Sequence, residues 1–190
     1  MAFQLIAGHP ALDFVNTLDW RFRKEGAEEL LNTYGDLLRF TEQSKLLTSK
    51  QARELGRFGS DPTMVRCREL REALADTFYA RVPSIRSRAT LERYFKAALL
   101  EHNLSWKQSP HLEWAWSSAR KHPDLPLWAL AMSALELMTS EAVDRVHACN
   151  NPECRWLFLD TSKNHTRRWC DMKVCGNRMK ARRFKAQRKA

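Results

Sequence analysis

The segment CNNPECRWLFLDTSKNHTRRWCDMKVCGNR, residues 149–178, contains four of the five cysteines in this chain of 190 residues. Four residues separate Cys149 from Cys154, four separate Cys170 from Cys175, and fifteen separate the two pairs. Two close pairs joined by a short connection are typical of a tetrahedral site in which four thiolates hold one zinc ion. Such a site leaves no open position on the metal. The spacing therefore predicts one structural Zn²⁺ and a recognition module, not a zinc enzyme.

The alternative for these cysteines is a pair of disulfides in a secreted domain. The opening MAFQLIAGHPALDF argues against secretion, because it has no basic leader and Gln4, Gly8 and Pro10 break its apolar stretch. We therefore expect reduced thiols, zinc and a cytoplasmic location. No uncharged apolar run approaches the ~18 residues needed to cross a bilayer, so we expect no membrane span.

The end of this segment and the start of the chain resemble a known family. Cys175-Gly176-Asn177-Arg178, preceded by Arg168-Trp169-Cys170, looks like the CGNR zinc finger. The opening HPALDFVNT, residues 9–17, is similar to the start of the ABATE domain, which precedes this finger in bacteria. The resemblance covers the whole chain, and the finger shows no departure from the pattern. It implies a stress-associated transcription regulator that binds DNA through the finger.

The net charge of +10 is unevenly distributed along the chain. Residues 149–190 contain twelve Lys and Arg against three Asp and Glu, which gives +9. The other 148 residues contain the remaining twenty and nineteen, which gives +1. This asymmetry favours a polyanionic partner for the C-terminal segment, either nucleic acid or an acidic membrane surface. A solvated basic tail that aids solubility is the alternative.

We predict an α+β fold with two domains. Residues 1–145 form a mostly helical domain with a small antiparallel sheet, and residues 146–190 form a zinc finger with a basic helix. The nearly all-apolar stretch 125–138 predicts a central buried helix. Cys67 has no ligand at coordinating spacing, so we expect it to be packed in a core. Other helices are expected to start at Asn32 or Thr33, Thr48, Asp61 and Thr90.

Two stretches of the N-terminal domain have the pattern of strands. Residues 3–7 predict a short strand, and 104–107 with 112–116 predict a hairpin that turns at Ser109-Pro110. Alternation places Trp106, Trp114 and Trp116 on one face of this hairpin. These rings can stack on nucleobases, but packing beneath a helix layer is favoured, because only one lysine lies among them.

The finger is predicted to contain a hairpin followed by a helix. Residues 155–159 predict a strand with Trp156 and Phe158 facing one way and Leu157 and Leu159 the other. Residues 166–169 are expected to return as the second strand, and a helix follows from about residue 176 to 189. By analogy, this is a treble-clef-like zinc finger with four cysteine ligands. No Gly/Ser linker precedes Cys149, so the finger should pack rigidly on the first domain.

The basic helix and the hairpin supply the candidate nucleic-acid contacts. Arg178, Arg182 and Lys185 share an i, i+4, i+7 stripe that suits a line of phosphates. The candidates are Lys163, Asn164, Arg167, Arg168, Asn177, Arg178, Lys180, Arg182, Arg183, Lys185, Arg188 and Lys189.

Two roles remain open for Asn177 and Arg178. At the start of the helix they can reach base edges, Arg to guanine and Asn to adenine. They can also support the metal site, with Asn177 bonded to the zinc knuckle and Arg178 paired with Asp160 or Asp171.

A polar group near the N-terminus also has two interpretations. His9, Asp13 and Asn16 either cap and turn a short helix or line a pocket for a small-molecule effector. The resemblance to the ABATE domain is the reason to consider the pocket.

We expect a zinc-dependent DNA-binding transcription regulator whose N-terminal domain senses a ligand or partner, with duplex DNA preferred over RNA. One finger reads few bases, so a homodimer would help specificity. The alternatives are an RNA-binding or ribosome-associated zinc protein, a protein-interaction finger and a His-Asn-His nuclease. The nuclease is considered because Asn164-His165 lies in the predicted hairpin. Residues 176–190 contain no histidine to hold a catalytic metal, so we expect no enzymatic activity.

Overall fold

The computed structural model describes residues 2–59, 61–108, 110–116 and 122–188. It confirms the predicted α+β class, with strands forming two-stranded antiparallel ribbons throughout the part of the chain that is described. The elements are α1 (Pro10–Val15), β1 (Leu18–Asp19), β2 (Glu28–Glu29), α2 (Tyr34–Gln43), α3 (Ser49–Leu55), α4 (Asp61–Ala80), α5 (Ile85–Glu101), β3 (His102–Gln108), β4 (His111–Trp116), α6 (Leu125–Thr139), the 3₁₀-helix η2 (Glu141–Arg145), β5 (Val146–Ala148), β6 (Leu157–Leu159), the π-helix η3 (Met172–Gly176) and α7 (Asn177–Gln187).

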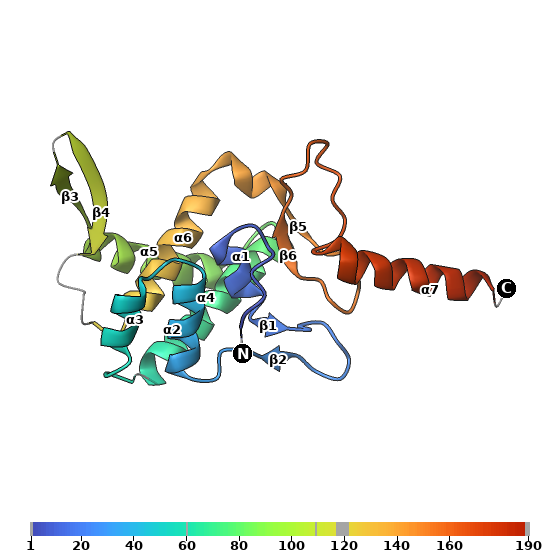
Figure 1. The fold of residues 1–190 in the computed structure, drawn as a ribbon, viewed down its shortest axis with the longest axis horizontal. Coiled ribbons are helices and arrows are strands. Elements are labelled where there is room, and N and C mark those ends of the chain that lie inside the picture. Colours follow the sequence, from blue (N-terminus) through green and yellow to red (C-terminus); the bar gives the residue numbers. More distant parts are fainter. Residues whose placement is uncertain (1, 60, 109, 117–121, 189–190) are drawn as a thin grey trace.

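Helices α1 to α6 gather in one body, and two elements extend from its opposite ends (Figure 1). The β3–β4 ribbon leaves one end, and α7 leaves the other. Within the ranges that the structure describes, no helix is both long and apolar enough to cross a membrane.

Helix α6 lies at the centre of the N-terminal core, as its apolar sequence predicts. It contacts α1, α2, α4 and α5, and most of its side chains are buried. Each fully buried leucine stabilises the fold by about 1.5–3 kcal/mol relative to exposure. Cys67 on α4 is also fully buried, and burial raises the pKa of its thiol. The burial confirms that Cys67 is packed in a core.

Two of the predicted helix caps are confirmed. The Thr33 hydroxyl accepts from the Asp36 amide while the Asp36 carboxylate accepts from the Thr33 amide, which forms a capping box at the start of α2. Thr48 and Gln51 make the same exchange at α3.

The start predicted at Thr90 is wrong. Helix α5 begins at Ile85, and the hydroxyl of Ser84 caps it by accepting from the Ser87 amide. Asp76 fixes this cap by accepting from the amide of Ser84 at 2.9 Å. Ser84 can cap a helix as well as Thr90 can, and starting there adds more than a turn of helix.

The strand predicted over residues 3–7 is also wrong. Phe3 exchanges hydrogen bonds with the side chain of Gln43 and not with a strand. Ala7 accepts one bond from the Leu159 amide at 2.7 Å, and Gly8 then turns the chain with a φ of +82°. Because side chains and a single backbone bond satisfy this segment, it forms no ladder.

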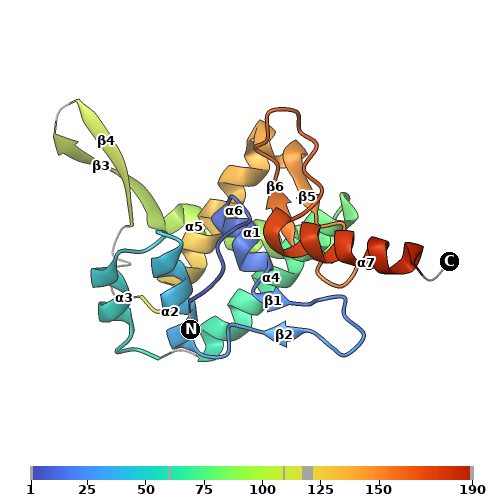
Figure 2. The ribbon, with the colours of Figure 1, turned by 45° about the vertical axis from the view of Figure 1, so that its right-hand side comes forward.

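The hairpin predicted around residues 104–116 forms as β3–β4, although Ser109 of its turn lies outside the described residues. The predicted packing of its tryptophans is wrong. Trp106 is 70% exposed and Trp114 is 61% exposed. Only Trp116, at the base of the ribbon, approaches a helix, with its ring 6.5 Å from that of Trp128. The ribbon extends past the helices, so no layer of the described chain covers its tip (Figure 2).

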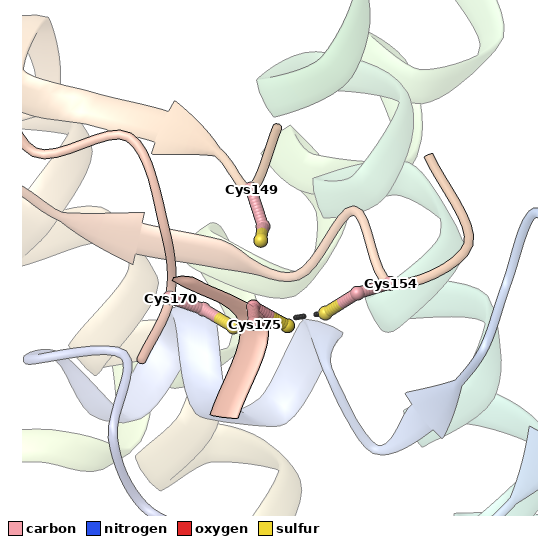
Figure 3. Close-up of side chains that lie close together, drawn as sticks. All are labelled: Cys149, Cys154, Cys170 and Cys175. Carbon is pink, nitrogen blue, oxygen red and sulfur yellow. Dashed lines mark hydrogen bonds between the residues drawn. The ribbon is translucent and has the colours of Figure 1, made fainter. Parts of the chain in front are cut away.

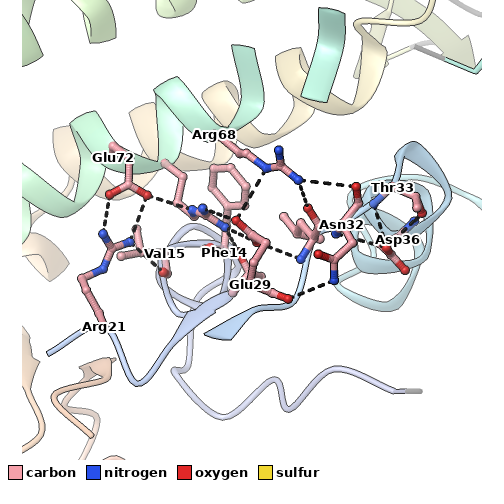
Figure 4. A network of polar contacts seen from close by, with 12 residues as sticks. Phe14, Val15, Arg21, Glu29, Asn32, Thr33, Asp36, Arg68 and Glu72 are labelled. Atoms are coloured by element: carbon pink, nitrogen blue, oxygen red, sulfur yellow. Dashed lines mark hydrogen bonds and ion pairs between the residues drawn. The ribbon is translucent and has the colours of Figure 1, made fainter. Parts of the chain in front are cut away.

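A polar network ties α4 to the β1–β2 ribbon (Figure 4). Arg71 is 3% exposed and donates to both carboxylate oxygens of Glu29, at 2.7 and 2.6 Å. Arg21, which follows β1, pairs with Glu72, the residue next to Arg71 on α4. A buried guanidinium is tolerated when it is fully paired in this way. The network holds the segment that includes Trp20, which contacts the finger.

Candidate zinc centre and nucleic-acid interface

The four predicted ligands converge on one point (Figure 3). Cys149 follows β5, Cys154 lies on the turn before β6, Cys170 ends the next loop and Cys175 lies in η3. All four are buried, and their sulfur atoms lie within 4.8 Å of one another. The Sγ atoms of Cys154 and Cys170 are 3.6 Å apart, and those of Cys170 and Cys175 are 3.7 Å apart.

These distances fit a single zinc ion. A tetrahedron with Zn–S bonds of about 2.3 Å has S···S edges of about 3.8 Å. Four thiols this close cannot all ionise without a cation between them. Hydrogen bonds from Cys154 and Cys170 lower the pKa of Cys149, and the same bonds raise the pKa of the two donors. The cluster is therefore a site for one structural Zn²⁺, whose binding releases protons from the thiols.

Asn151 supports the metal site from the first knuckle, a role that the sequence analysis missed. It is fully buried, and its Nδ2 donates to Cys175 Sγ at 3.6 Å. Its backbone oxygen accepts from the amides of Cys154 and Arg155, which closes the turn. Amide donors to a ligand sulfur stabilise its negative charge and fix its direction. The position of Asn151, two residues after Cys149, was the signal in the sequence for this role. Its burial against Cys175 depends on the tertiary fold and could not be predicted locally.

The second knuckle runs directly into α7. Asp171 Oδ1 accepts from the amides of Lys173 and Val174 and so caps η3. Asn177 Nδ2 donates to the Lys173 carbonyl at 3.0 Å, as the supporting role for Asn177 predicts. A Cβ atom on Gly176 would lie 2.5 Å from Met172 Sδ, so glycine allows the turn to pack tightly.

Arg178 makes a contact that neither sequence alternative anticipated. Its guanidinium lies over the ring of Trp20, 5.4 Å from the centroid. Asp160 and Asp171 bond backbone amides instead of Arg178. Arg178 therefore joins the start of α7 to the N-terminal part of the chain through a cation–π contact.

The return strand predicted over 166–169 is wrong, because β6 pairs with β5 and the following loop is irregular. Asp160 is fully buried and accepts from the amides of Ser162 and Arg167, both at 2.8 Å. Burial alone would raise the pKa of Asp160, but these hydrogen bonds outweigh it and lower the pKa to about 2. A side chain thus satisfies the amides that a ladder would use.

The side chain of Arg167 also stabilises this loop by contacts within the finger. Its guanidinium donates to the carbonyls of Trp169 and Cys170 and lies 4.5 Å from the centroid of the Phe158 ring. Of the predicted loop contacts, Lys163, Asn164 and Arg168 are the ones with exposed side chains.

The predicted stripe on α7 is partly occupied by the protein itself. Arg182 pairs with Glu153 at 2.7 Å, and Arg178 stacks on Trp20. Lys180, Arg183 and Lys185 are exposed and make no ion pair with any residue that the structure describes. Arg188 lies over Phe184, and Lys189 falls outside the described residues. No side chain of α7 is buried.

Strand β6 belongs to two cores at once, which confirms its predicted alternation. Leu157 and Leu159 enter the core of the N-terminal helices, whereas Trp156 and Phe158 pack with the cysteines. The Trp156 Nε1 also donates to Asp19 at 2.7 Å. The finger is therefore packed directly on the N-terminal domain, as the missing linker predicts.

The three polar residues near the N-terminus all bond backbone groups. His9 caps α1 by accepting from the Ala11 amide, and Asp13 accepts from the Ala7 amide at 2.9 Å. Burial raises the pKa of Asp13 to about 6 and lowers that of His9. Asn16 exchanges two hydrogen bonds of 2.9 Å with the backbone of Leu157. His9 agrees with the capping interpretation, whereas Asn16 joins α1 to the finger, which neither interpretation anticipated. The effector pocket stays a prediction.

Replacing Asn16 with alanine should weaken the joint between α1 and the finger. The change leaves the buried amide and carbonyl of Leu157 without partners, and each such group costs about 1–3 kcal/mol. We expect the free energy of unfolding of the zinc-loaded protein to fall by about 2–4 kcal/mol in urea titrations. Asn164→Ala, at an exposed position, is the matched control. A loss below about 0.5 kcal/mol for Asn16→Ala, typical of surface changes, would contradict this account.

Two family models match the chain. The CGNR zinc finger model covers residues 145–188. The ABATE model, described as "Putative stress-induced transcription regulator", covers residues 8–141. A search of curated proteins found no match.

Proposed function

Because this chain belongs to the ABATE family and ends in a CGNR zinc finger, we propose that it is a transcription regulator that binds duplex DNA through its zinc-held basic helix. The observation that supports this most is the set of exposed cations on α7, a helix that extends from the body (Figure 1). An α-helix of this kind fits the major groove of B-DNA.

We assign each candidate residue a role in DNA binding according to whether its side chain already has a partner in the protein. Lys180, Arg183 and Lys185 are free to neutralise phosphates or approach bases. Lys163 and Arg168 on the loop add phosphate contacts. Asn177 and Arg178 act as supports for α7, because their side chains already bond the knuckle and Trp20.

Further parts of the proposal concern what the protein does around this contact. The N-terminal domain senses a ligand or partner, and the protein acts in the cytoplasm without enzymatic activity. Four thiolates fill the coordination sphere of zinc, which supports a structural role for the metal. RNA is the competing partner, because a basic helix with an exposed aromatic such as Phe184 suits either nucleic acid.

The proposal is tested by removing the free cations of α7. In the variant Lys180→Gln/Arg183→Gln/Lys185→Gln, affinity for duplex DNA at low salt should fall by on the order of a hundredfold, and the salt slope should shrink by about 3. The matched control removes three exposed cations near α3, as Lys50→Gln/Arg53→Gln/Arg57→Gln. Fluorescence anisotropy measures both. Equal weakening in the two variants would mean that only net charge matters.

A further inference from the structure

A cavity of about 450 Å³ lies between the end of α4 and the finger. None of its lining residues is acidic. Guanidinium and imidazole groups in this concentration suit an anion with several oxygen acceptors. The basic cleft is lined by four arginines and two histidines, namely Arg81, Arg155, Arg167, Arg168, His147 and His165.

Three of these residues adopt a backbone conformation that side chains disfavour. Arg81, Arg155 and His165 have φ values of +64°, +56° and +48°. They are three of the five non-glycine residues with positive φ in the described chain. Glycine adopts this left-handed region without penalty, yet the sequence places two arginines and a histidine there. Strain of this kind gathers where the direction of a side chain serves binding.

The walls of the basic cleft are fixed, while two of its guanidinium groups are free. Arg81 donates to the Val146 carbonyl at 3.0 Å, and Tyr79 donates from its hydroxyl to the Arg155 carbonyl at 3.0 Å. No hydrogen bond or ion pair joins the side chains of Arg155 and Arg168 to another residue within the described ranges. A rigid frame with unused donors loses little entropy when it binds a ligand.

We propose that the basic cleft binds a phosphoryl group, with Arg155 and Arg168 as its principal donors. A guanidinium offers two parallel hydrogen bonds to such a group. The volume exceeds what one phosphate fills and is within the range of small-molecule sites, so it admits a diphosphate or a nucleotide. The group belongs either to a small phosphorylated ligand or to a nucleic-acid backbone.

The basic cleft is lined by residues from both the N-terminal domain and the finger. Arg81 follows α4 in the N-terminal domain, whereas Arg155 and Arg168 belong to the finger. A bound anion would therefore bridge the two parts of the chain. The basic cleft lies outside the free cations of α7 and shares only Arg168 with the proposed DNA contact, so pyrophosphate binding tests it whether or not DNA binds.

The test is calorimetric titration of the zinc-loaded full chain with sodium pyrophosphate, against sodium chloride at equal ionic strength. In Arg155→Gly/Arg168→Gln, pyrophosphate should bind at least tenfold more weakly, because two charged donors are lost. Glycine suits the φ of residue 155, so zinc content and thermal midpoint should not fall. Arg53→Gln/Arg57→Gln makes the same charge change elsewhere and should bind like the unmodified protein.

Two outcomes would overturn the basic cleft as a phosphoryl site. One is unchanged pyrophosphate affinity in the double variant, and the other is no binding beyond the chloride blank. The source of the group is read from DNA binding. Because Arg168 is also a proposed DNA contact, competition and not the loss of DNA affinity decides the source. Pyrophosphate that displaces DNA assigns the group to the nucleic-acid backbone, and pyrophosphate that binds without displacing DNA assigns it to a small ligand. Pyrophosphate binding without any DNA binding would refute the proposed function alone.

The β3–β4 ribbon presents an apolar face that is independent of the basic cleft. The register pairs Leu104 with Trp114 and Trp106 with Leu112, so these four side chains share one face. Between 49% and 70% of each is exposed. At about 150–250 Å² for a whole aromatic side chain, the face exposes on the order of 500 Å². An apolar patch of this size is as large as the largest one on a typical monomer, and such patches are often functional.

We infer that a second copy of this chain covers this ribbon face. Lys107 pairs with Glu113 at 2.8 Å, and residues 102–116 contain no other Lys, Arg, Asp or Glu. The ribbon lacks the free cations that nucleic acid needs. In a chain of net charge +10, two copies repel each other least at a neutral surface. Two such faces would bury roughly 1,000 Å², which is the lower limit for a specific interface and suits a weak dimer.

Sedimentation velocity of the zinc-loaded full chain tests this inference. The unmodified protein should dimerise in the micromolar range, and Trp106→Ser/Trp114→Ser should be monomeric with unchanged helical circular dichroism. Leu112→Lys, which places a charge on the face, should also be monomeric. Ser105→Thr, on the opposite face, is the control and should dimerise. A monomeric unmodified protein, or a dimer that persists in both face variants, would overturn the inference.

Discussion

Cys154→Ala should abolish duplex DNA binding and unfold the C-terminal segment, while the N-terminal helices stay folded. The finger's own core consists of the four cysteines with Trp156 and Phe158, so it has few apolar contacts without the metal. Structural zinc contributes about 10–16 kcal/mol in isolated fingers, far more than such a core can replace. The helices around α6 pack in a different and much larger cluster, to which β6 adds only Leu157 and Leu159, so they should keep most of the helical signal.

The measurement combines zinc content, circular dichroism and anisotropy with labelled DNA. Cys67→Ala is the matched control, because Cys67 is buried in α4 and distant from the zinc site in sequence. The control should keep one zinc per chain and its DNA affinity, with a modest loss of stability from the cavity. A chelator should reproduce the effect of Cys154→Ala. DNA affinity that survives in the metal-free protein would show that the basic charge acts without the fold of the finger.

DNA affinity should fall by about a thousandfold between about 50 and 200 mM salt. The contacts in the structure set this expectation, because three predicted cations are already occupied. Arg182 pairs with Glu153, Arg178 stacks on Trp20, and Arg167 bonds the loop carbonyls. Six cations remain for phosphates, and six contacts give a slope of log K against log salt near −5. These are Lys163, Arg168, Lys180, Arg183, Lys185 and Arg188.

Anisotropy titrations at several salt concentrations give this slope. The triple variant of α7 lowers the count from six to three, so its slope should be about half that of the unmodified protein. The control variant near α3 should keep the full slope. A slope near zero for the unmodified protein would contradict a phosphate-based interface.

Local patterns in the sequence predicted the metal site and the alternation of β6. Ligand spacing is a local property, and so is the period of two that sends Leu157 and Phe158 to opposite sides. Capping at Thr33 and Thr48 was predictable for the same reason, because each box closes within four residues.

Features that depend on distant contacts could not be predicted. The bond between Asn16 and Leu157 joins residues 141 positions apart, and no pattern near either one reveals it. The return strand failed because the Asp160 side chain, and not a neighbouring strand, satisfies the loop amides. The predicted packing of the hairpin tryptophans was wrong, because alternation predicts that they share a face but cannot predict whether a helix covers that face.

The central claim is that the zinc-bound finger binds duplex DNA. The most direct test is an anisotropy titration of the zinc-loaded full chain with random-sequence duplex DNA, followed by competition with matched duplex and single-stranded RNA. We predict that the DNA binds with a steep salt dependence and that neither RNA displaces it at equal nucleotide concentration. Displacement by RNA, or no binding to DNA at low salt, would contradict the claim.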